Sequence, residues 1–281
     1  MLDQNEISLI IMAAGHGSRF GGPKQLMPVG TNGEFLVDYS IEYAIEQGIE
    51  EIVIVTNSSF ETTLCNHLKK FDSRAQVTLK YQDIFTKEYD NTAVLYGTAI
   101  AMLAGAVGCS NSVIVLNADD YYGREGFESV TETLLNNTNV EACLAGYHLE
   151  TTLSDFGTVS RAVCTSDVNN FLHDISEYHH IQKDLAGNIS TSDGVLFSGK
   201  EPVSMNFWGF KQIFIDFVEE EFRHFVLSNV ENHEFGIPDL VKQYIKLHKN
   251  SLLICPLNTS EWAGLTYPED LDKVKTFLKG K

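Results

Sequence analysis

Hydrophobic residues in the first half of the chain alternate between short apolar runs and stretches with helical spacing. Strands are predicted at 9–12, 52–55, 77–81 and 113–116. Between them, apolar residues recur every three or four positions, which predicts helices at 35–47, 60–71 and 92–106. This alternation continues to residue 135. It predicts an α/β fold with a doubly wound, mostly parallel sheet, whose ligands lie beyond the carboxyl ends of the strands.

The pattern becomes less regular after residue 140. It predicts strands at 143–149, 157–163 and 205–210, and helices at 213–225 and 237–247. These elements favour a mixed sheet in the second half. No Pro/Ser-rich linker, charge block or repeat separates the two parts. We therefore expect a single domain over residues 1–281, with a first half at 1–135 and a second half at 136–281.

A glycine-rich loop follows the first predicted strand. Glycines at such a point let backbone N–H groups approach phosphate oxygens without side-chain obstruction. Arg19 and Lys24 would supply positive charge to the same phosphates. The loop therefore predicts a triphosphate cradle, with backbone contacts from Ala13, Ala14, Gly15, Gly17 and Ser18.

Two better-known glycine loops do not fit this segment. A dinucleotide-binding fingerprint that starts at Gly15 would need a glycine where Phe20 stands. A P-loop that starts at Gly17 would need a lysine at the position of Pro23, and a serine or threonine after Lys24. What remains is Gly-x-Gly-Ser-Arg followed by Pro-Lys.

A second polar cluster, Asn-Ala-Asp-Asp-Tyr-Tyr-Gly at 117–123, follows the strand predicted at 113–116. Carboxylates there face the ligand crevice. Neighbouring residues on an extended chain point in opposite directions unless the chain turns sharply, so we expect Asp119 to bind Mg²⁺ directly. Asp120 would be a second ligand or would support the first. The formal charge of −18 also favours a magnesium site, because a triphosphate must be held against this negative field by a few local cations together with a metal ion.

These motifs resemble the signature of the nucleotidyltransferase superfamily, which joins a nucleoside triphosphate to a sugar 1-phosphate or a similar phosphate monoester and releases pyrophosphate. The stretch Pro-Lys-Gln-Leu-Met-Pro-Val at 23–29 is similar to glucose-1-phosphate thymidylyltransferases. The resemblance implies a Rossmann-like nucleotidyltransferase fold with an acceptor-binding second half. It also implies two catalytic residues: Arg19 would neutralise the leaving pyrophosphate, and Lys24 the region of the α-phosphate.

The same resemblance leaves the nucleobase open. Gln82 follows the strand predicted at 77–81, where the family often has a glutamine that contacts the base. The next stretch, 87–96, lacks the glycines usual in thymidylyl- and uridylyltransferases and looks more like phosphocholine cytidylyltransferases. Asn91 in that stretch is a further candidate for nucleotide binding.

Acceptor-binding residues are implied in the second half. Gly157 lies in a Phe-Gly strip that resembles the backbone lining of the sugar pocket, and Asn206 lies in a strand that resembles the family's Asn-containing strand. Glu177 stands where an acidic sugar contact is common, but Tyr178 replaces the lysine expected beside it. The aromatic residues at 207, 208 and 210 are expected to pack in the core.

The segment 262–271 resembles the Thr-Pro-Glu-Asp-Leu helix start of the family. The metal-binding aspartate usual just upstream is missing, because Gly264, Leu265 and Thr266 occupy that region. Either Asp120 or Glu261 completes the metal shell, or magnesium arrives mainly with the triphosphate.

Other functions stay open from the sequence. The acceptor could be phosphocholine or a phosphonate, with an aromatic cage drawn from Tyr89, Tyr96, Tyr121 and Trp208. A glycosyltransferase would use the two aspartates but would leave the cradle without a purpose. A regulator that binds sugar nucleotides without turnover is the non-enzyme alternative.

Composition adds limits on partners and location. The acidic balance argues against a nucleic-acid surface. No run of about 18 apolar residues or signal-peptide pattern is present, so the cytoplasm is expected and a membrane is not. The five scattered cysteines are expected to be buried thiols. The sequence leaves the oligomeric state open, and a homo-oligomer is one of the alternatives.

Overall fold

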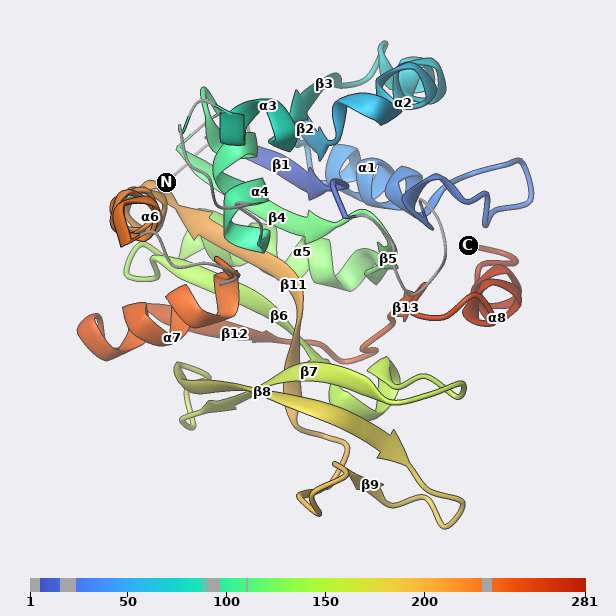
Figure 1. Cartoon of the computed structure of the whole chain (residues 1–281), viewed down its shortest axis with the longest axis vertical. Coiled ribbons are helices and arrows are strands. Elements are labelled where there is room, and N and C mark those ends of the chain that lie inside the picture. The colour runs from blue at the N-terminus through green and yellow to red at the C-terminus, as the bar shows by residue number, and fades with distance from the viewer. Residues whose placement is uncertain (1–5, 16–23, 88, 90–96, 110, 229–233) are drawn as a thin grey trace.

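The computed structural model describes residues 6–15, 24–87, 89, 97–109, 111–228 and 234–281. Its strands form an 11-stranded mixed sheet with the order β10-β9-β8-β7-β11-β4-β1-β2-β3, to which β6 and β12 are attached beside β11 (Figure 1). The sheet has a parallel part and an antiparallel extension, and the elements of each are described below.

The parallel part confirms the strands expected in the first half. It contains β1 (Ile7–Met12), β2 (Glu51–Thr56), β3 (Gln76–Tyr81) and β4 (Ser112–Asn117), which pair in the order β3-β2-β1-β4. All six residues of β1 are buried. This is why its sequence is apolar at every position except Ser8, without alternation.

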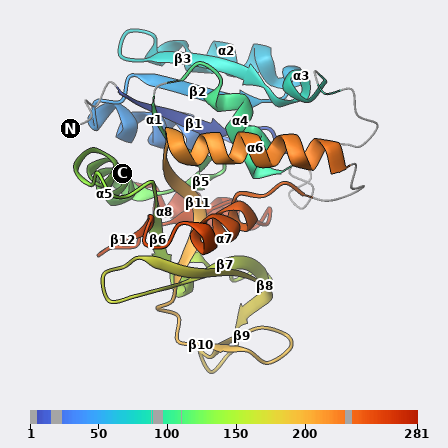
Figure 2. The same ribbon diagram turned by 90° about the vertical axis from the view of Figure 1, so that its left-hand side faces the viewer.

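Helices cover both faces of the sheet (Figure 2). The core on one face includes side chains of α1 (Leu36–Glu46), α2 (Glu61–Leu68), α5 (Gly123–Asn136) and α8 (Asp270–Phe277). The core on the other includes α4 (Thr98–Ala106), α6 (Gln212–Ser228) and α7 (Ile237–Leu247). A short helix, α3 (Gln82–Lys87), follows β3. The doubly wound arrangement is therefore confirmed for this part of the sheet.

The antiparallel extension is built on one long strand, β11 (Pro202–Lys211). It pairs with β4 near its C-terminal end, with β7 (Val159–Ser166) near its N-terminal end, and with β6 (Ala142–His148) at both. In both views an arm of strands reaches away from the parallel part (Figures 1 and 2). The arm continues through β8 (Leu172–Lys183), β9 (Ile189–Ser190) and β10 (Leu196–Phe197), while β12 (Leu252–Pro256) runs parallel to β6.

The sequence analysis missed β8 and β12. Only three of the twelve residues of β8, namely Leu172, Ile175 and Ile181, are buried. Such a strand leaves no apolar run and no clean alternation to detect. β12 is a short strand after α7 that pairs with β6, and its apolar run at 252–255 was a signal that went unused.

β11 has an irregularity at Asn206. Its register against β6 shifts between Ser204 and Trp208, and Asn206 has a φ of 59°. Asparagine tolerates this left-handed conformation better than most residues with a side chain. The bulge bends the strand next to the predicted acceptor residue.

The expectation that all five cysteines are buried needs correction. Cys143, Cys164 and Cys255 are buried, but Cys65 is exposed and Cys109 is only partly buried. Within the described ranges, no helix has the length and apolar character needed to span a membrane.

Candidate functional site

A cavity of about 320 Å³ opens where the parallel part meets the antiparallel extension. It lies beyond the carboxyl end of β4, as expected for an open α/β sheet. Its walls come from several segments of the chain that are distant in sequence. They are formed by Lys24, Thr98, Asn117, Asp119, Asp120, Ser160, Arg161, Ala162, Glu177, Ser204, Met205, Asn206, Glu234, Gly236, Pro238, Asp239, Trp262, Leu265 and Thr266.

The two aspartates after β4 both line this cavity. The chain turns at residues 118 and 119, and β5 (Asp120–Tyr121) begins directly afterwards. Because of this turn, the side chains do not diverge as they would on a straight strand. Asp119 is partly exposed, with about 21% of its side chain accessible, whereas Asp120 is buried.

Lys24 reaches Asp119 across the cavity wall. Its Nζ forms an ion pair with Asp119 Oδ2 and donates a hydrogen bond to the carbonyl of Leu265 at 2.9 Å. Leu265 in turn donates its N–H to the carbonyl of Asp119 at 3.2 Å. The predicted phosphate-binding lysine and the predicted metal ligand are thus direct neighbours.

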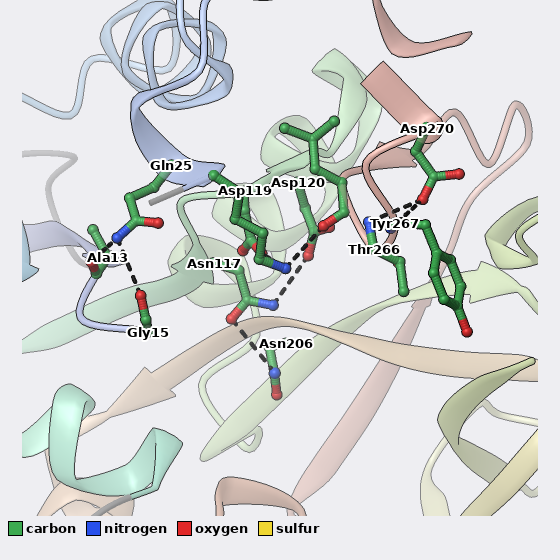
Figure 3. A network of polar contacts seen from close by, with 12 residues as sticks. Ala13, Gly15, Gln25, Asn117, Asp119, Asp120, Asn206, Thr266, Tyr267 and Asp270 are labelled. Atoms are coloured by element: carbon green, nitrogen blue, oxygen red, sulfur yellow. Dashed lines mark hydrogen bonds and ion pairs between the residues drawn. The ribbon is translucent and has the colours of Figure 1, made fainter. Parts of the chain in front are cut away.

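Gln25 fixes the start of the glycine-rich loop and was not predicted. This buried side chain donates through Nε2 to the carbonyls of Ala13 at 3.0 Å and Gly15 at 3.2 Å (Figure 3). It ties the segment that begins at Lys24 to the end of β1. The sequence signal was its place directly after the cradle lysine.

Asp120 is held by a network behind the cavity wall. Its Oδ2 accepts hydrogen bonds from Asn117 Nδ2 at 3.0 Å and from the Tyr122 hydroxyl at 3.2 Å. Burial raises the pKa of the Asp120 carboxyl to about 7, and repulsion from Asp119 adds to the shift. In the absence of a cation, this buried carboxyl is therefore easily protonated near neutral pH.

Asn206 joins this network from the antiparallel side. Its Nδ2 lies 3.5 Å from Asn117 Oδ1, so Asn117 links Asn206 to Asp120 (Figure 3). Sequence reasoning did not assign a role to Asn117, although it is the last residue of β4. That position at a strand end was the available signal.

The C-terminal segment has a glycine, Gly264, in the region where the resembled family usually has a metal-binding aspartate. β13 (Ala263–Gly264) pairs with β5, and a Cβ on Gly264 would lie 2.3 Å from Asp120 Oδ1 and 2.4 Å from Trp262. The carboxylate of Asp120 thus lies in the space that a side chain at 264 would need. Glu261, the alternative candidate, forms an ion pair with Lys281 instead.

The cavity wall formed by the antiparallel extension and by the start of α7 with the residues before it has more acidic than basic side chains. It carries Glu177, Glu234 and Asp239. Burial raises the pKa of Glu234, and the charges of Glu177 and Asp239 raise it further. Arg161, which sequence reasoning missed, is the one described cation that lines the cavity besides Lys24.

Other predicted residues lie elsewhere or cannot be placed. Gly157 packs against Tyr267, whose hydroxyl lies 2.6 Å from where a Cβ would be. Gln82 begins α3, and neither it nor Gly157 is among the residues that line the cavity. Four predicted site residues lie outside the described ranges: Gly17, Ser18, Arg19 and Asn91.

The three described residues among those proposed for an aromatic cage do not form one. Trp208 and Tyr121 are enclosed in the core, as expected of the aromatic residues at 207, 208 and 210. Tyr89 packs against Phe85 and Phe222. Tyr96 lies outside the described residues.

The two carboxylates fit a magnesium ion that binds together with phosphates. No group of three or more His, Cys, Asp or Glu side chains that could hold a metal occurs in the described part of the chain. Magnesium usually keeps several waters and takes one or two protein carboxylates plus substrate phosphates. Asp119 and Asp120 meet that lesser requirement.

Comparison with known families identifies the chemistry of this site. Residues 9–119 match the MobA-like NTP transferase domain, a region that contains Lys24 and Asp119. This part of the chain is a nucleotidyltransferase domain. The enzyme therefore acts on a nucleoside triphosphate and a phosphate acceptor.

Solved structures share the fold over nearly the whole chain. The inositol-1-phosphate CTP transferase from T. maritima is 13% identical, with a TM-score of 0.67 over 100% of this chain and 98% of that one. A putative glucose-1-phosphate thymidylyltransferase from Bacillus anthracis is 14% identical, with a TM-score of 0.68 and coverage of 98% and 96%.

A third structure has a different kind of acceptor in its name. It is the CTP:phosphocholine cytidylyltransferase from Streptococcus pneumoniae, 15% identical, with a TM-score of 0.63 and coverage of 97% and 99%. No curated protein sequence matches the chain significantly. The nucleotidyltransferase fold is therefore confirmed over both halves.

Proposed function

We propose that this nucleotidyltransferase joins a nucleoside triphosphate to a sugar 1-phosphate and forms a nucleoside-diphosphate sugar and pyrophosphate. One observation carries the proposal. A single cavity brings the Lys24–Asp119 pair to the same space as Asn206 and Glu177, which come from the antiparallel extension. Two substrates can therefore meet there.

In the proposed reaction, an oxygen of the acceptor phosphate attacks the α-phosphorus of the triphosphate. The bond from that phosphorus to the oxygen bridging to the β-phosphate breaks in line, and pyrophosphate leaves with the electron pair. Such transfers depend mainly on positioning and on neutralisation of charge. Lys24 would stabilise the α-phosphate, and Arg19 the leaving pyrophosphate.

Asp119 and Asp120 would hold Mg²⁺, which supplies charge neutralisation to the phosphates when it is bound. Asp119 is the more accessible ligand, whereas Asp120 is oriented by Asn117 and Tyr122. On the acceptor side, the Asn206 amide and the Glu177 carboxylate offer a donor and acceptors for sugar hydroxyls. Gln82, Asn91 and Gly157 remain predicted substrate contacts without such support.

A second candidate acceptor is a phosphate monoester or phosphonate that carries a cationic group, such as phosphocholine. The acidic wall of Glu177, Glu234 and Asp239 favours it, because three carboxylates attract a cation. Their carboxylates would take the place of the aromatic cage expected from the sequence.

The test is a screen of the purified full chain with Mg²⁺, the four common nucleoside triphosphates, a panel of sugar 1-phosphates, phosphocholine and 2-aminoethylphosphonate. We expect pyrophosphate release with one acceptor class, and no release from the Lys24→Ala variant above background. Release with phosphocholine alone would favour the second candidate. If no pair of substrates released pyrophosphate although the chain bound nucleotide tightly, the result would instead support a regulator.

A glycosyltransferase would be distinguished from a nucleotidyltransferase by the product of its reaction. It would release a nucleoside diphosphate from a finished nucleotide sugar and would produce no pyrophosphate. Chromatography of the reaction mixture distinguishes the two nucleotide products directly. We expect the nucleoside-diphosphate conjugate to accumulate together with pyrophosphate in equal amounts.

A further inference from the structure

We infer that Arg161 binds the phosphate group of the acceptor. The inference rests on the proposed function, because it assigns a residue to the second substrate of the same cavity. Arg161 lies on β7 and lines the cavity wall opposite the nucleotide-binding half. Its partner across the antiparallel ladder is Tyr178, the position at which the resemblance leads one to expect a lysine. The cationic side chain stands on the neighbouring strand instead.

The guanidinium of Arg161 is oriented by its surroundings. Its Nε donates to Thr152 Oγ1 at 3.1 Å, one terminal nitrogen donates to the Ser160 carbonyl at 2.8 Å, and the other donates to the Thr152 carbonyl. It also lies over the indole of Trp262, 5.5 Å from the ring centroid. An arginine held in one plane is suited to bidentate binding of a phosphate.

Trp262 connects Arg161 to the reaction centre. The indole carbon Cζ2 lies 2.4 Å, and Asp120 Oδ1 lies 2.3 Å, from the single point that a Cβ on Gly264 would occupy. Trp262 therefore lies close to both the guanidinium of Arg161 and the carboxylate of Asp120. A phosphate on Arg161 would share the cavity that Asp119 and Asp120 also line.

The charge of the described cavity lining favours an anion at this place. Five carboxylates line the cavity, on Asp119, Asp120, Glu177, Glu234 and Asp239. Among the described lining residues, the cations are Lys24 and Arg161. With Lys24 assigned to the α-phosphate, a second phosphate would be repelled from most of the remaining wall and attracted to Arg161.

Binding of inorganic phosphate tests the assignment without turnover. The intrinsic tryptophan fluorescence of the full chain would be titrated with phosphate at constant ionic strength, with Trp262 as the reporter beside Arg161. We expect a saturable change that Trp262→Phe removes. Arg161→Gln should raise the apparent Kd at least 10-fold, and Arg161→Lys should raise it less. Arg223→Gln, a change at an exposed arginine on α6, should have no effect.

Steady-state kinetics with an acceptor found by the screen gives the second readout. Arg161→Gln should raise the KM of the acceptor about 10-fold or more and leave the KM of the nucleoside triphosphate within about twofold. Circular dichroism and thermal unfolding would verify that each variant is folded. A merely structural arginine would change both KM values or the stability, and would not discriminate between the substrates.

The outcomes separate the two claims. An unchanged phosphate Kd in Arg161→Gln, or no phosphate response in the wild-type chain, overturns the assignment. An unchanged acceptor KM in an enzyme that does release pyrophosphate overturns it as well, while the proposed function stands. If phosphate binding depends on Arg161 but no substrate pair reacts, the proposed function fails and the assignment to an acceptor fails with it.

Discussion

The two halves of the cavity are built in different ways. On the parallel side, Asn117 ends one buried strand and Asp119 and Asp120 follow it directly, while Lys24 reaches Asp119 from the segment after another strand. On the antiparallel side, Asn206 stands at a bulge, and Arg161 and Glu177 come from neighbouring strands of the arm. The parallel side positions its residues by topology, and the antiparallel side by local irregularity and cross-strand pairing.

The comparison leads us to expect that changes on the parallel side affect turnover most. Lys24→Ala should lower kcat by roughly 100- to 1,000-fold, because a charge on the reacting phosphates is lost. The measurement is pyrophosphate release at saturating substrates. Lys273→Ala is the control, since that exposed lysine forms an ion pair with Asp155 at the surface. A loss of less than about threefold in Lys24→Ala would contradict its role. Arg19→Ala carries the same expectation.

Asp120 lies at the junction of the two sides, and its buried carboxyl should make the stability of the folded chain depend on pH. Its carboxyl pKa rises from 3.8 in the unfolded chain to about 7 in the folded one. The folded chain then binds more protons, so stability falls as pH rises from about 4 to 7. Asp120→Asn removes this loss. In the presence of a chelator, its Tm should exceed that of the wild-type chain by several degrees at pH 8.

The difference in Tm between Asp120→Asn and the wild-type chain should shrink at pH 5, where the wild-type carboxyl of Asp120 is protonated. Thermal unfolding followed by circular dichroism at both pH values measures it. Asp83→Asn is a useful comparison: burial raises the pKa of that carboxyl, but hydrogen bonds from Ser58 outweigh it and the pKa is lowered. Asp83 is therefore ionised at both pH values, and Asp83→Asn should lose the same stability at pH 5 and at pH 8. An Asp120→Asn advantage that is equal at pH 5 and pH 8 would contradict the account.

The smallest effects are expected on the antiparallel side. Asn206→Ala should cost about 1 kcal/mol of stability, because alanine is strained at a φ of 59°, whereas Asn206→Gly relieves the strain. Both variants lose the amide and should raise the acceptor KM by a similar factor, roughly 10-fold. Urea unfolding and acceptor titrations separate the two effects. Equal stabilities of the two variants would show that the bulge is not strained.

The same contrast explains what the sequence could predict. The four parallel strands are continuous apolar runs or lie between clear helices, and site residues at their ends follow from the topology rule. Asp119, Asp120 and Lys24 could therefore be identified, and the structure brings them together. The family match over residues 9–119 supports the chemistry of this half.

The antiparallel side gave fewer local signals. Nothing in the spacing of β8 predicts a strand with three buried residues, so the pairing that places Arg161 opposite Tyr178 could not be deduced. Gly157 was selected by resemblance, but here it makes room for Tyr267. The acidic wall contains Glu234 and Asp239, which reach the cavity from a segment about 60 residues after Glu177 in sequence.

The ion pair between Lys24 and Asp119 has a thermodynamic consequence for the order of assembly. Each of the two charges already has its counter-charge. A free metal ion that binds Asp119 therefore leaves Lys24 without its anionic partner, and a metal-free triphosphate that binds Lys24 leaves Asp119 without its cationic partner. A ligand that brings a cation and phosphates together replaces both partners at once. Affinities for metal and nucleotide at this pair are thus linked, and by reciprocity each raises the other by the same factor.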